Sequence, residues 1–550
     1  MTENTSGASA VLDSAHAGDI EGAFGTIRQG DVAPRNRTSM RLKTLLAVIG
    51  PGVIVMVGDN DAGAFGTYTQ AGQNYGTTML WTLLLLVPVI YVNQEMVLRL
   101  GAVTGVGHAR LILERYGKFW GAFSVIDLFL LNALTIVTEF IGISLGLSYL
   151  GLPKVPGVLA AVVLVIASVS TGSFRRFERV SMVLVAGSLT LIPIFLAVHP
   201  PMGQVVHDFV VPGMPAGSQL STVMLLIIAI VGTTVAPWQL FFQQSYLIDK
   251  RITPRFIRYE RVDLWIGIVI VVVGAGAMMA FSAAAFAGTP AQGNFTDALG
   301  ISQGLAAAAG RWAGILFAIA LIDASIIGAA AVGLSTSYAL GDVLGLRHSL
   351  HRRPSEAKGF YAVFAGLLVL SAVIVLIPGS PLGLLTEGVQ TLAGVLLPSA
   401  TVFLLLLCND KAVLGPWVNG RRTNAFTAAI IAVLVMLSVI LTAAVLFPDI
   451  NGKQIVFILE GGTVFAIAVT GIVRWIEERK ANPAPLAAST EKAAGDPVAR
   501  EQWRMPPLAM LPPLRLTLLH RVWMGVLRGY LVIAAGMLLV KIVRMAAGAA

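Results

Sequence analysis

The chain has 550 residues, of which 56% are hydrophobic and 12% are charged, and its mean hydropathy is +0.80. This composition excludes a soluble globular domain and is typical of a polytopic membrane protein. The single cysteine, Cys408, excludes a disulfide framework and any metal site built from several cysteines.

The N-terminal segment is polar and lacks the apolar core of a signal peptide. We predict a disordered cytoplasmic tail over residues 1–43. The apolar stretches that follow are long enough to span a bilayer and predict an all-α protein with about 12 (11–13) transmembrane helices. They lie at residues 44–72, 78–100, 119–149, 155–172, 178–199, 221–247, 263–287, 312–341, 358–378, 382–408, 425–447 and 455–475.

This pattern divides the chain into transmembrane helices 1–6 (44–247) and helices 7–12 (248–477). Residues 478–520 are rich in Pro and Ala and are expected to form a flexible cytoplasmic linker. An apolar C-terminal helix is expected within 521–550. Its core is short and flanked by Arg528 and Lys541, so both a thirteenth span and an interfacial helix remain open.

Basic residues give the orientation. Lys and Arg gather before helix 1 and after helices 2, 4, 6, 8 and 10, whereas the alternate loops carry only Lys154, Arg311 and Lys453. Because cytoplasmic loops carry the excess of basic residues, the N-terminus is predicted to be cytoplasmic, in the cell (inner) membrane. The net charge of +9 therefore reflects topology and gives no indication of nucleic-acid binding.

Acidic residues lie inside the predicted spans without basic partners. Asp59 and Asp61 lie in helix 1, Glu139 in helix 3 and Asp323 in helix 8, while all seven His lie in loops or tails. A charged group in the hydrocarbon region costs several kcal/mol and is by default a functional-site hypothesis. Since no cationic side chain is available, we expect these acids to be protonated, to face water, or to bind a transported cation.

Two predicted spans are interrupted in matching places. Helix 1 contains "GDNDAG", with Gly58 and Gly63 around the acids, and helix 6 contains "VGTTVAPW", with Gly232 and Pro237. Helix 6 comes five spans after helix 1, an odd number, so the two helices run in opposite directions, as inverted repeats require. Matching breaks point to a substrate site near the bilayer midplane.

These motifs resemble those of the Nramp (natural-resistance-associated macrophage protein) divalent-metal transporters. "GDNDAGAF" and "VGTTVAPWQLFFQQS" are similar to helices 1 and 6 of that family, and "TEFIGISLGL" and "LIDASIIGAAAVGLSTSYALGDVLG" to helices 3 and 8. The resemblance covers about residues 44–475. It implies a leucine-transporter-type fold of five-plus-five inverted repeats, with broken helices 1 and 6 and a metal site between them.

The chain departs from the family at the site itself. Asp61 matches the family's aspartate, but Ala64 stands at its asparagine and Ala236 at its methionine. Thr233 takes the place of a carbonyl-donating alanine, and Trp238 that of a histidine. The predicted metal site comprises Asp61, Asp59, Thr233, Ala236 and Ala64. The predicted pathway or second shell comprises Trp238, Glu139, Gln239 and Asp323.

With Ala236 in place of the family's methionine, the site has no thioether and offers only hard oxygen ligands. Ala236 and Ala64 also enlarge the site, which suits an ion such as Mg²⁺ that keeps several of its water molecules. This pattern is similar to the Nramp-related magnesium transporters. We therefore predict a uniporter that imports Mg²⁺ and Mn²⁺ by alternating access. Since the family's histidine and one of its helix 3 acids are absent, we expect transport without proton coupling, driven by the membrane potential, which contributes about 4.6 kcal/mol for two charges at 100 mV.

Two alternatives remain: a proton-coupled Mn²⁺/Fe²⁺ importer of the Nramp type, and a cation-coupled transporter of an organic amine or amino acid. The chain contains no catalytic motif of the H-E-x-x-H, G-x-S-x-G or Walker type, so we expect no enzyme activity. We expect no permanently bound cofactor. The expected partners are the metal substrate and the lipid bilayer.

Overall fold

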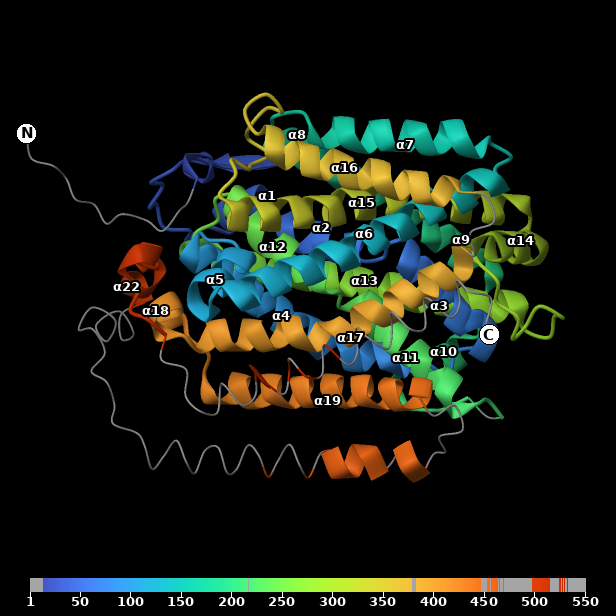
Figure 1. Cartoon of the computed structure of the whole chain (residues 1–550). Coiled ribbons are helices and arrows are strands. Elements are labelled where there is room, and N and C mark those ends of the chain that lie inside the picture. The colour runs from blue at the N-terminus through green and yellow to red at the C-terminus, as the bar shows by residue number, and fades with distance from the viewer. Residues whose placement is uncertain are drawn as a thin grey trace, which may run out of the picture.

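The structure is a computed structural model of the chain. It describes residues 13–215, 217–377, 382–446 and 497–514, with scattered positions between 453 and 468 and between 524 and 532. Within these residues the protein is a bundle of α-helices with a single pair of short strands near the N-terminus. Figure 1 shows the long helices lying alongside one another.

The helices follow the apolar stretches of the sequence. The long ones are α4 (Trp81–Thr104), α6 (Lys118–Tyr149), α7 (Lys154–Val169), α13 (Ile257–Phe286), α15 (Arg311–Leu344), α16 (Lys358–Leu376), α17 (Leu382–Asn409) and α19 (Arg421–Leu446). Helices α8 (Phe174–Gly187) and α9 (Leu191–Val198) follow each other closely and together form one long span. Shorter helices between them are α5 (His108–Tyr116), α10 (Met202–Val210), α14 (Ala298–Ala309) and α18 (Lys411–Leu414).

Nine helices in the described part of the chain are long and apolar enough to cross a membrane, or ten if one bent pair counts as a span. The number is lower than the twelve predicted. One reason is that α7, with 16 residues, is shorter than the others. Another is that the predicted span at 455–475 and the apolar stretch at 529–543 lie mostly outside the described residues. The protein is thus an all-helical, multi-pass membrane protein.

The first predicted span is interrupted twice. Its segments are α1 (Thr38–Val48), α2 (Pro51–Gly58) and α3 (Ala62–Tyr75). The interruption after Gly58 confirms the predicted break. The bend of 47° between α1 and α2 was not predicted. It lies at Gly50, whose φ of 150° is accessible to glycine and strained for other residues.

The predicted break in helix 6 is also confirmed. Two residues separate the end of α11 (Leu220–Thr234) from the start of α12 (Pro237–Asp249). Pro237 occupies the first turn of α12, where an amide hydrogen has no partner within the helix. Helix α2 packs against α12, and α3 packs against α11, so the two breaks lie side by side. Each half of the first broken helix therefore packs against a half of the other broken helix.

The N-terminal segment is folded from Asp13 onward, which differs from the disorder predicted for residues 1–43. Strands β1 (Ile20–Gly22) and β2 (Gly25–Ile27) form an antiparallel hairpin that packs against α1 and α8. The guanidinium of Arg251 donates hydrogen bonds to the carbonyl oxygens of Ala15 (2.8 Å) and Asp19 (3.0 Å). Polar composition indicated disorder because these stabilising contacts come from residues far along the chain.

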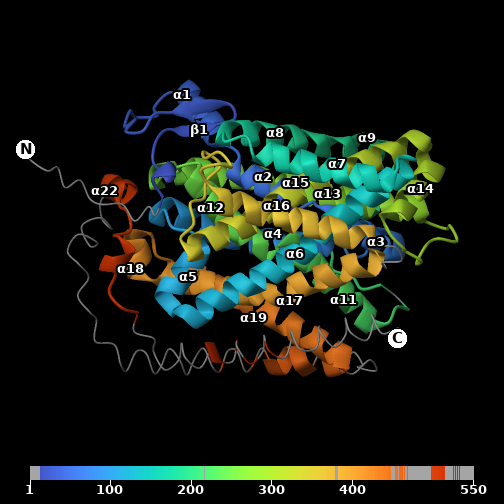
Figure 2. The same ribbon diagram turned by 45° about the horizontal axis from the view of Figure 1, so that its top comes forward.

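Part of the predicted flexible linker is also folded. Residues 497–514 contain α22 (Pro497–Gln502) and lie against one end of the bundle, beside α18 (Figures 1 and 2). The amide of Met505 donates to the carbonyl oxygen of Val103 at 3.2 Å, and the Trp417 indole donates to the carbonyl oxygen of Arg500 at 2.9 Å. These contacts place the segment against α4 and the residues after α18.

Candidate metal site at the helix breaks

The break in helix 1 places two acidic side chains inside the bundle. Asp59 caps the C-terminus of α2, and Asp61 caps the N-terminus of α3, where its Oδ1 accepts a hydrogen bond from the amide of Ala64 at 2.9 Å. Both aspartates are at most 3% exposed. The capping role explains why α3 begins here, since an aspartate satisfies an amide that has no partner within the helix.

The break in helix 6 contributes backbone and a buried hydroxyl. Val235 and Ala236 leave the helical conformation, and Ala236 caps α12 with an extended backbone. The Thr233 hydroxyl is buried and has no hydrogen-bond partner in the described part of the chain. Backbone carbonyls released at such breaks are suitable ligands for a cation.

A chain of amides links the two breaks. The side-chain nitrogen of Gln239 on α12 donates a hydrogen bond to Oδ1 of Asp59, and its Oε1 accepts one from Gln94 at 2.8 Å. The second oxygen of Asp59, Oδ2, is buried without a hydrogen-bond partner among the described residues. A buried carboxylate oxygen left unpaired is costly unless a proton or a cation satisfies it.

Glu139 approaches the same break from α6. Its Oε2 accepts a hydrogen bond from the amide of Ala62 at 3.2 Å, and its side chain is close enough to interact with that of Asp61. Glu139 is fully buried, and its Oε1 has no hydrogen-bond partner in the described residues. Two carboxylates this close in a buried site cannot both carry a negative charge without a large cost.

The acidic cluster has no basic partner among the residues that the structure describes. Among the ion pairs of the described residues, none involves Asp59, Asp61 or Glu139. Within the described chain, no group of three or more His, Cys, Asp or Glu side chains has metal-binding geometry. The possible metal ligands at the breaks belong to several chemical types: carboxylates, amides, hydroxyls and backbone carbonyls.

Two residues near the breaks were missed by the sequence analysis. The hydroxyl groups of Tyr68 on α3 and Thr234 on α11 are joined by a hydrogen bond of 2.7 Å. This bond links one half of each broken helix. Gln390 on α17 lies so close to Gly63 that a side-chain carbon at that glycine would meet its amide nitrogen. That nitrogen is buried without a partner among the described residues. A search of the spans for buried amides, in addition to acids, would have identified Gln390.

The structure also gives the positions of three other predicted residues. Gly232 lies within α11 instead of in the break, and a Cβ there would come within 2.2 Å of the Gln390 carbonyl oxygen. It therefore permits close packing of α11 against α17. Trp238 is buried and lies beside Gly58, with its indole nitrogen unpaired in the described residues. Asp323 lies against Gly187, where α8 ends, away from the broken helices.

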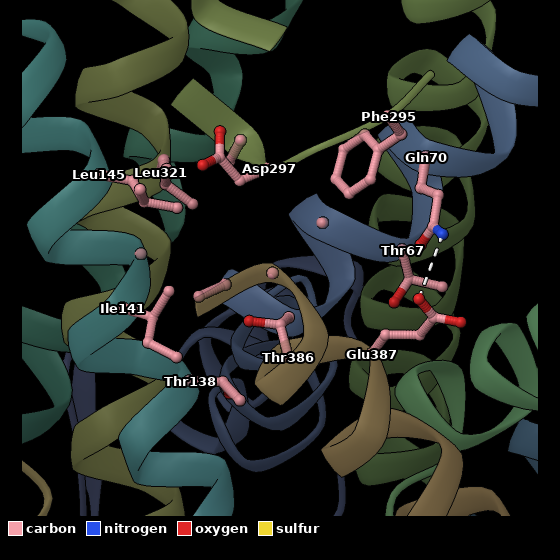
Figure 3. A pocket seen from close by; sticks show the side chains of 15 residues that line it. Thr67, Gln70, Thr138, Ile141, Leu145, Phe295, Asp297, Leu321, Thr386 and Glu387 are labelled. Carbon is pink, nitrogen blue, oxygen red and sulfur yellow. Dashed lines mark hydrogen bonds between the residues drawn. The ribbon is translucent and has the colours of Figure 1, made fainter. Parts of the chain in front are cut away.

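A pocket leads toward the break from the end of the bundle that carries α14. Figure 3 shows Thr67 and Gln70 of α3 facing Thr386 and Glu387 of α17, with Asp297 on the opposite wall. Gln70 and Glu387 are joined by a hydrogen bond of 3.5 Å. Ala62, the residue that follows Asp61, also lines this pocket. The pocket thus carries two acids in its walls and ends next to the metal-site candidate.

Known proteins share this architecture. Residues 52–444 match the family model described as "Natural resistance-associated macrophage protein-like". Among the curated relatives is the divalent metal cation transporter MntH of Ralstonia nicotianae, 29% identical over 410 residues that cover 71% of this chain and 89% of the relative. The MntH of Deinococcus radiodurans is 28% identical over 439 residues, covering 76% and 93%.

A solved structure of the Eremococcus coleocola manganese transporter, bound to an aromatic bis-isothiourea compound, matches with a TM-score of 0.63. It is 20% identical and covers 84% of this chain and 98% of the transporter. At this identity the match shows a shared fold.

Proposed function

Because the chain belongs to the Nramp family of divalent metal transporters, we propose that it imports Mn²⁺ through the paired helix breaks. It is a transporter and not an enzyme. The names of its relatives specify divalent metal cations and manganese. They support the proton-coupled Mn²⁺/Fe²⁺ alternative better than the magnesium uniporter predicted from the sequence as the main function.

The buried position of Asp61 between two half-helices is the observation that carries this proposal. A carboxylate is a good ligand for Mn²⁺, and helix breaks expose backbone carbonyls that add further oxygen donors. In this assignment Asp61 binds the ion, with Asp59, the Thr233 and Ala236 backbone and the space beside Ala64 around it. A divalent cation would also supply the positive charge that this cluster otherwise lacks.

We assign the proton pathway to Glu139. Glu139 accepts a hydrogen bond from the amide of Ala62, next to Asp61, so the two buried carboxyl groups lie side by side and one shared proton relieves the repulsion between them. A dication that binds Asp61 favours release of that proton. This exchange supports coupled movement of metal and proton, in place of the uncoupled transport predicted from the missing histidine.

The pairing of half-helices supports transport by alternating access. We propose that residues 44–247 and 248–477 contain the two inverted repeats of a fold with about twelve spans, in the cell membrane with a cytoplasmic N-terminus. In this assignment the pocket beside Asp297 and Glu387 is the outer entrance. Its acidic walls would raise the local concentration of cations.

Transport by the purified full-length protein in liposomes tests the proposal. With Mn²⁺ outside and a membrane potential negative inside, we expect Mn²⁺ to enter and the lumen to acidify. Asp61→Asn removes the charged ligand but keeps a side chain that can cap α3, so uptake should fall at least about tenfold while the protein remains folded. Asp323→Asn is the matched control, because Asp323 lies away from the breaks. Normal uptake by Asp61→Asn would contradict the assignment.

Magnesium is a second candidate substrate. Ala236 and Ala64 offer no side-chain donor, so the site lacks a soft ligand that discriminates against Mg²⁺. Competition between Mg²⁺ and Mn²⁺ during uptake distinguishes the two. If the protein transports only manganese, a large excess of Mg²⁺ leaves Mn²⁺ uptake unchanged. If it also transports magnesium, the same excess of Mg²⁺ inhibits Mn²⁺ uptake.

A further inference from the structure

A second pocket, of about 520 Å³, lies at the basic end of the bundle and shares no lining residue with the pocket beside Ala62. Its walls come from α4, α13, α19 and the folded C-terminal segment. Four arginines line it: Arg99, Arg261, Arg422 and Arg500. The acidic residue in its wall is Glu95. The pocket therefore carries a large excess of positive charge.

Glu95 is already engaged by two of these arginines. Its Oε2 accepts a hydrogen bond from Arg99 at 3.1 Å, and its Oε1 accepts one from Arg261 at 2.6 Å. Arg422 is exposed and makes no hydrogen bond or ion pair within the described chain. One carboxylate thus balances one of four guanidinium charges, and the rest are left for a ligand or solvent.

Arg99 is held rigidly and retains an unused donor. It is 6% exposed, and its terminal nitrogens donate to the carbonyl oxygen of Trp417 at 2.5 Å and to Oδ1 of Asn419 at 2.6 Å. Its Nε is buried without a partner in the described residues, as is the Nε of Arg261. A buried guanidinium donor without an acceptor is unfavourable, and an anionic oxygen would satisfy it.

Arg500 adds charge from the C-terminal segment. Its guanidinium stacks 4.2 Å from the centre of the Trp417 ring. The pKa of Arg500 is lowered by burial and by the nearby charges of Arg261 and Arg99. This repulsion shows that the positive charges converge, and an anion bound between them would relieve it.

The pocket also borders the apolar surface that faces lipid. Phe426 in its wall is 46% exposed, and Tyr91 stacks on Trp265, which is 43% exposed, with ring centres 4.8 Å apart. Exposed aromatic residues of this kind gather where a membrane protein passes from lipid to water. The arginines therefore lie at headgroup depth beside a surface suited to acyl chains.

We propose that this pocket binds the phosphate group of an anionic phospholipid at the membrane surface. Arginine forks match phosphate oxygens in geometry and charge, and basic pockets between transmembrane helices on the cytoplasmic side bind anionic headgroups. The lipid joins α4, α13 and α19 to the C-terminal segment through Arg500. Bound lipid thereby stabilises the docked position of residues 497–514.

Thermal unfolding of the full-length protein in detergent, with added ligand, tests this site. The probes are dioctanoyl phosphatidylglycerol, dioctanoyl phosphatidylcholine and inorganic phosphate. We expect phosphatidylglycerol to raise the Tm in a concentration-dependent manner, and phosphatidylcholine to have no such effect. If inorganic phosphate raises the Tm and phosphatidylglycerol does not, the lipid assignment is overturned and the ligand of the pocket is a free phosphate ion.

Two neighbouring arginines provide a matched pair of variants. Arg422→Gln removes a charge from the pocket wall and should weaken phosphatidylglycerol binding about fivefold, as expected for one basic residue at an anionic surface. Arg421→Gln removes the same charge one residue earlier, outside the pocket lining, and should leave binding unchanged. Equal losses in both variants, or no response of the wild type to phosphatidylglycerol and phosphate, would overturn the proposal.

Discussion

Glu139 on α6 accepts a hydrogen bond, 3.2 Å long, from the backbone amide of Ala62, the first residue of α3. The contact joins residues 77 positions apart and places a second carboxyl group beside Asp61. It also stabilises the start of α3, where amides lack partners within the helix. One side chain thus supports the break and supplies a proton-binding group beside the proposed metal ligand.

Glu139→Gln should separate metal movement from proton movement. The amide oxygen of glutamine can still accept the hydrogen bond from Ala62, so the break should persist, but glutamine cannot carry the proton. In liposomes with Mn²⁺ outside, we expect lumen acidification per transported Mn²⁺ to fall by about tenfold or more, while uptake driven by the membrane potential continues. Acidification at the wild-type ratio would show that another group carries the proton.

Ala236→Met should change the choice of metal. The thioether adds a soft ligand at the helix 6 break, which favours Mn²⁺ and Cd²⁺ over Mg²⁺. We expect the Mg²⁺ concentration needed to inhibit Mn²⁺ uptake to rise by roughly fivefold or more. Ala236→Leu, which has similar volume and no sulfur, is the control. An equal change in both variants would attribute the effect to volume alone.

Gly232→Ala should destabilise the protein without touching a ligand side chain. The added carbon would lie 2.2 Å from the Gln390 carbonyl oxygen, a backbone atom that cannot rotate away. Overpacking of this kind costs about 1–3 kcal/mol, so the Tm in detergent should fall. Gly366→Ala on α16, where a Cβ meets nothing within 4 Å, should leave the Tm unchanged or raise it slightly. The idea fails if both variants unfold alike.

His348 should make stability depend on pH. Burial lowers the pKa of its imidazole, but the Asp342 carboxylate, 3.1 Å away, raises it more strongly, to about 9 from 6.5. Because the folded-state pKa is the higher one, the stabilisation is complete below pH 6.5 and is lost as the pH rises through 9.

The expected loss is up to about 3 kcal/mol. Unfolding measured between pH 6.5 and 9.5 should show the wild type losing stability over this range, whereas His348→Gln should lose much less. Asp342→Asn should flatten the profile in the same way, since it removes the charge that raises the pKa. A parallel decline in all three proteins would place the titrating group elsewhere.

The sequence alone determined the features that depend on local chemistry. Apolar length fixed where most helices lie, because each span must cover the bilayer with its own residues. The acids Asp59, Asp61 and Glu139 stood out because no basic residue shares their spans. Gly58 and Pro237 marked breaks because glycine and proline disrupt a helix through their own backbones.

Only the tertiary structure decided which of these groups meet. Glu139 reaches Ala62 and Asp323 does not, because α6 packs against α3 at the break whereas Asp323 faces the end of α8. Tertiary contacts also fold the N-terminal hairpin and dock residues 497–514, two segments whose polar composition had indicated disorder or flexibility. Such contacts join residues hundreds of positions apart, and no local pattern of residues encodes which helices become neighbours.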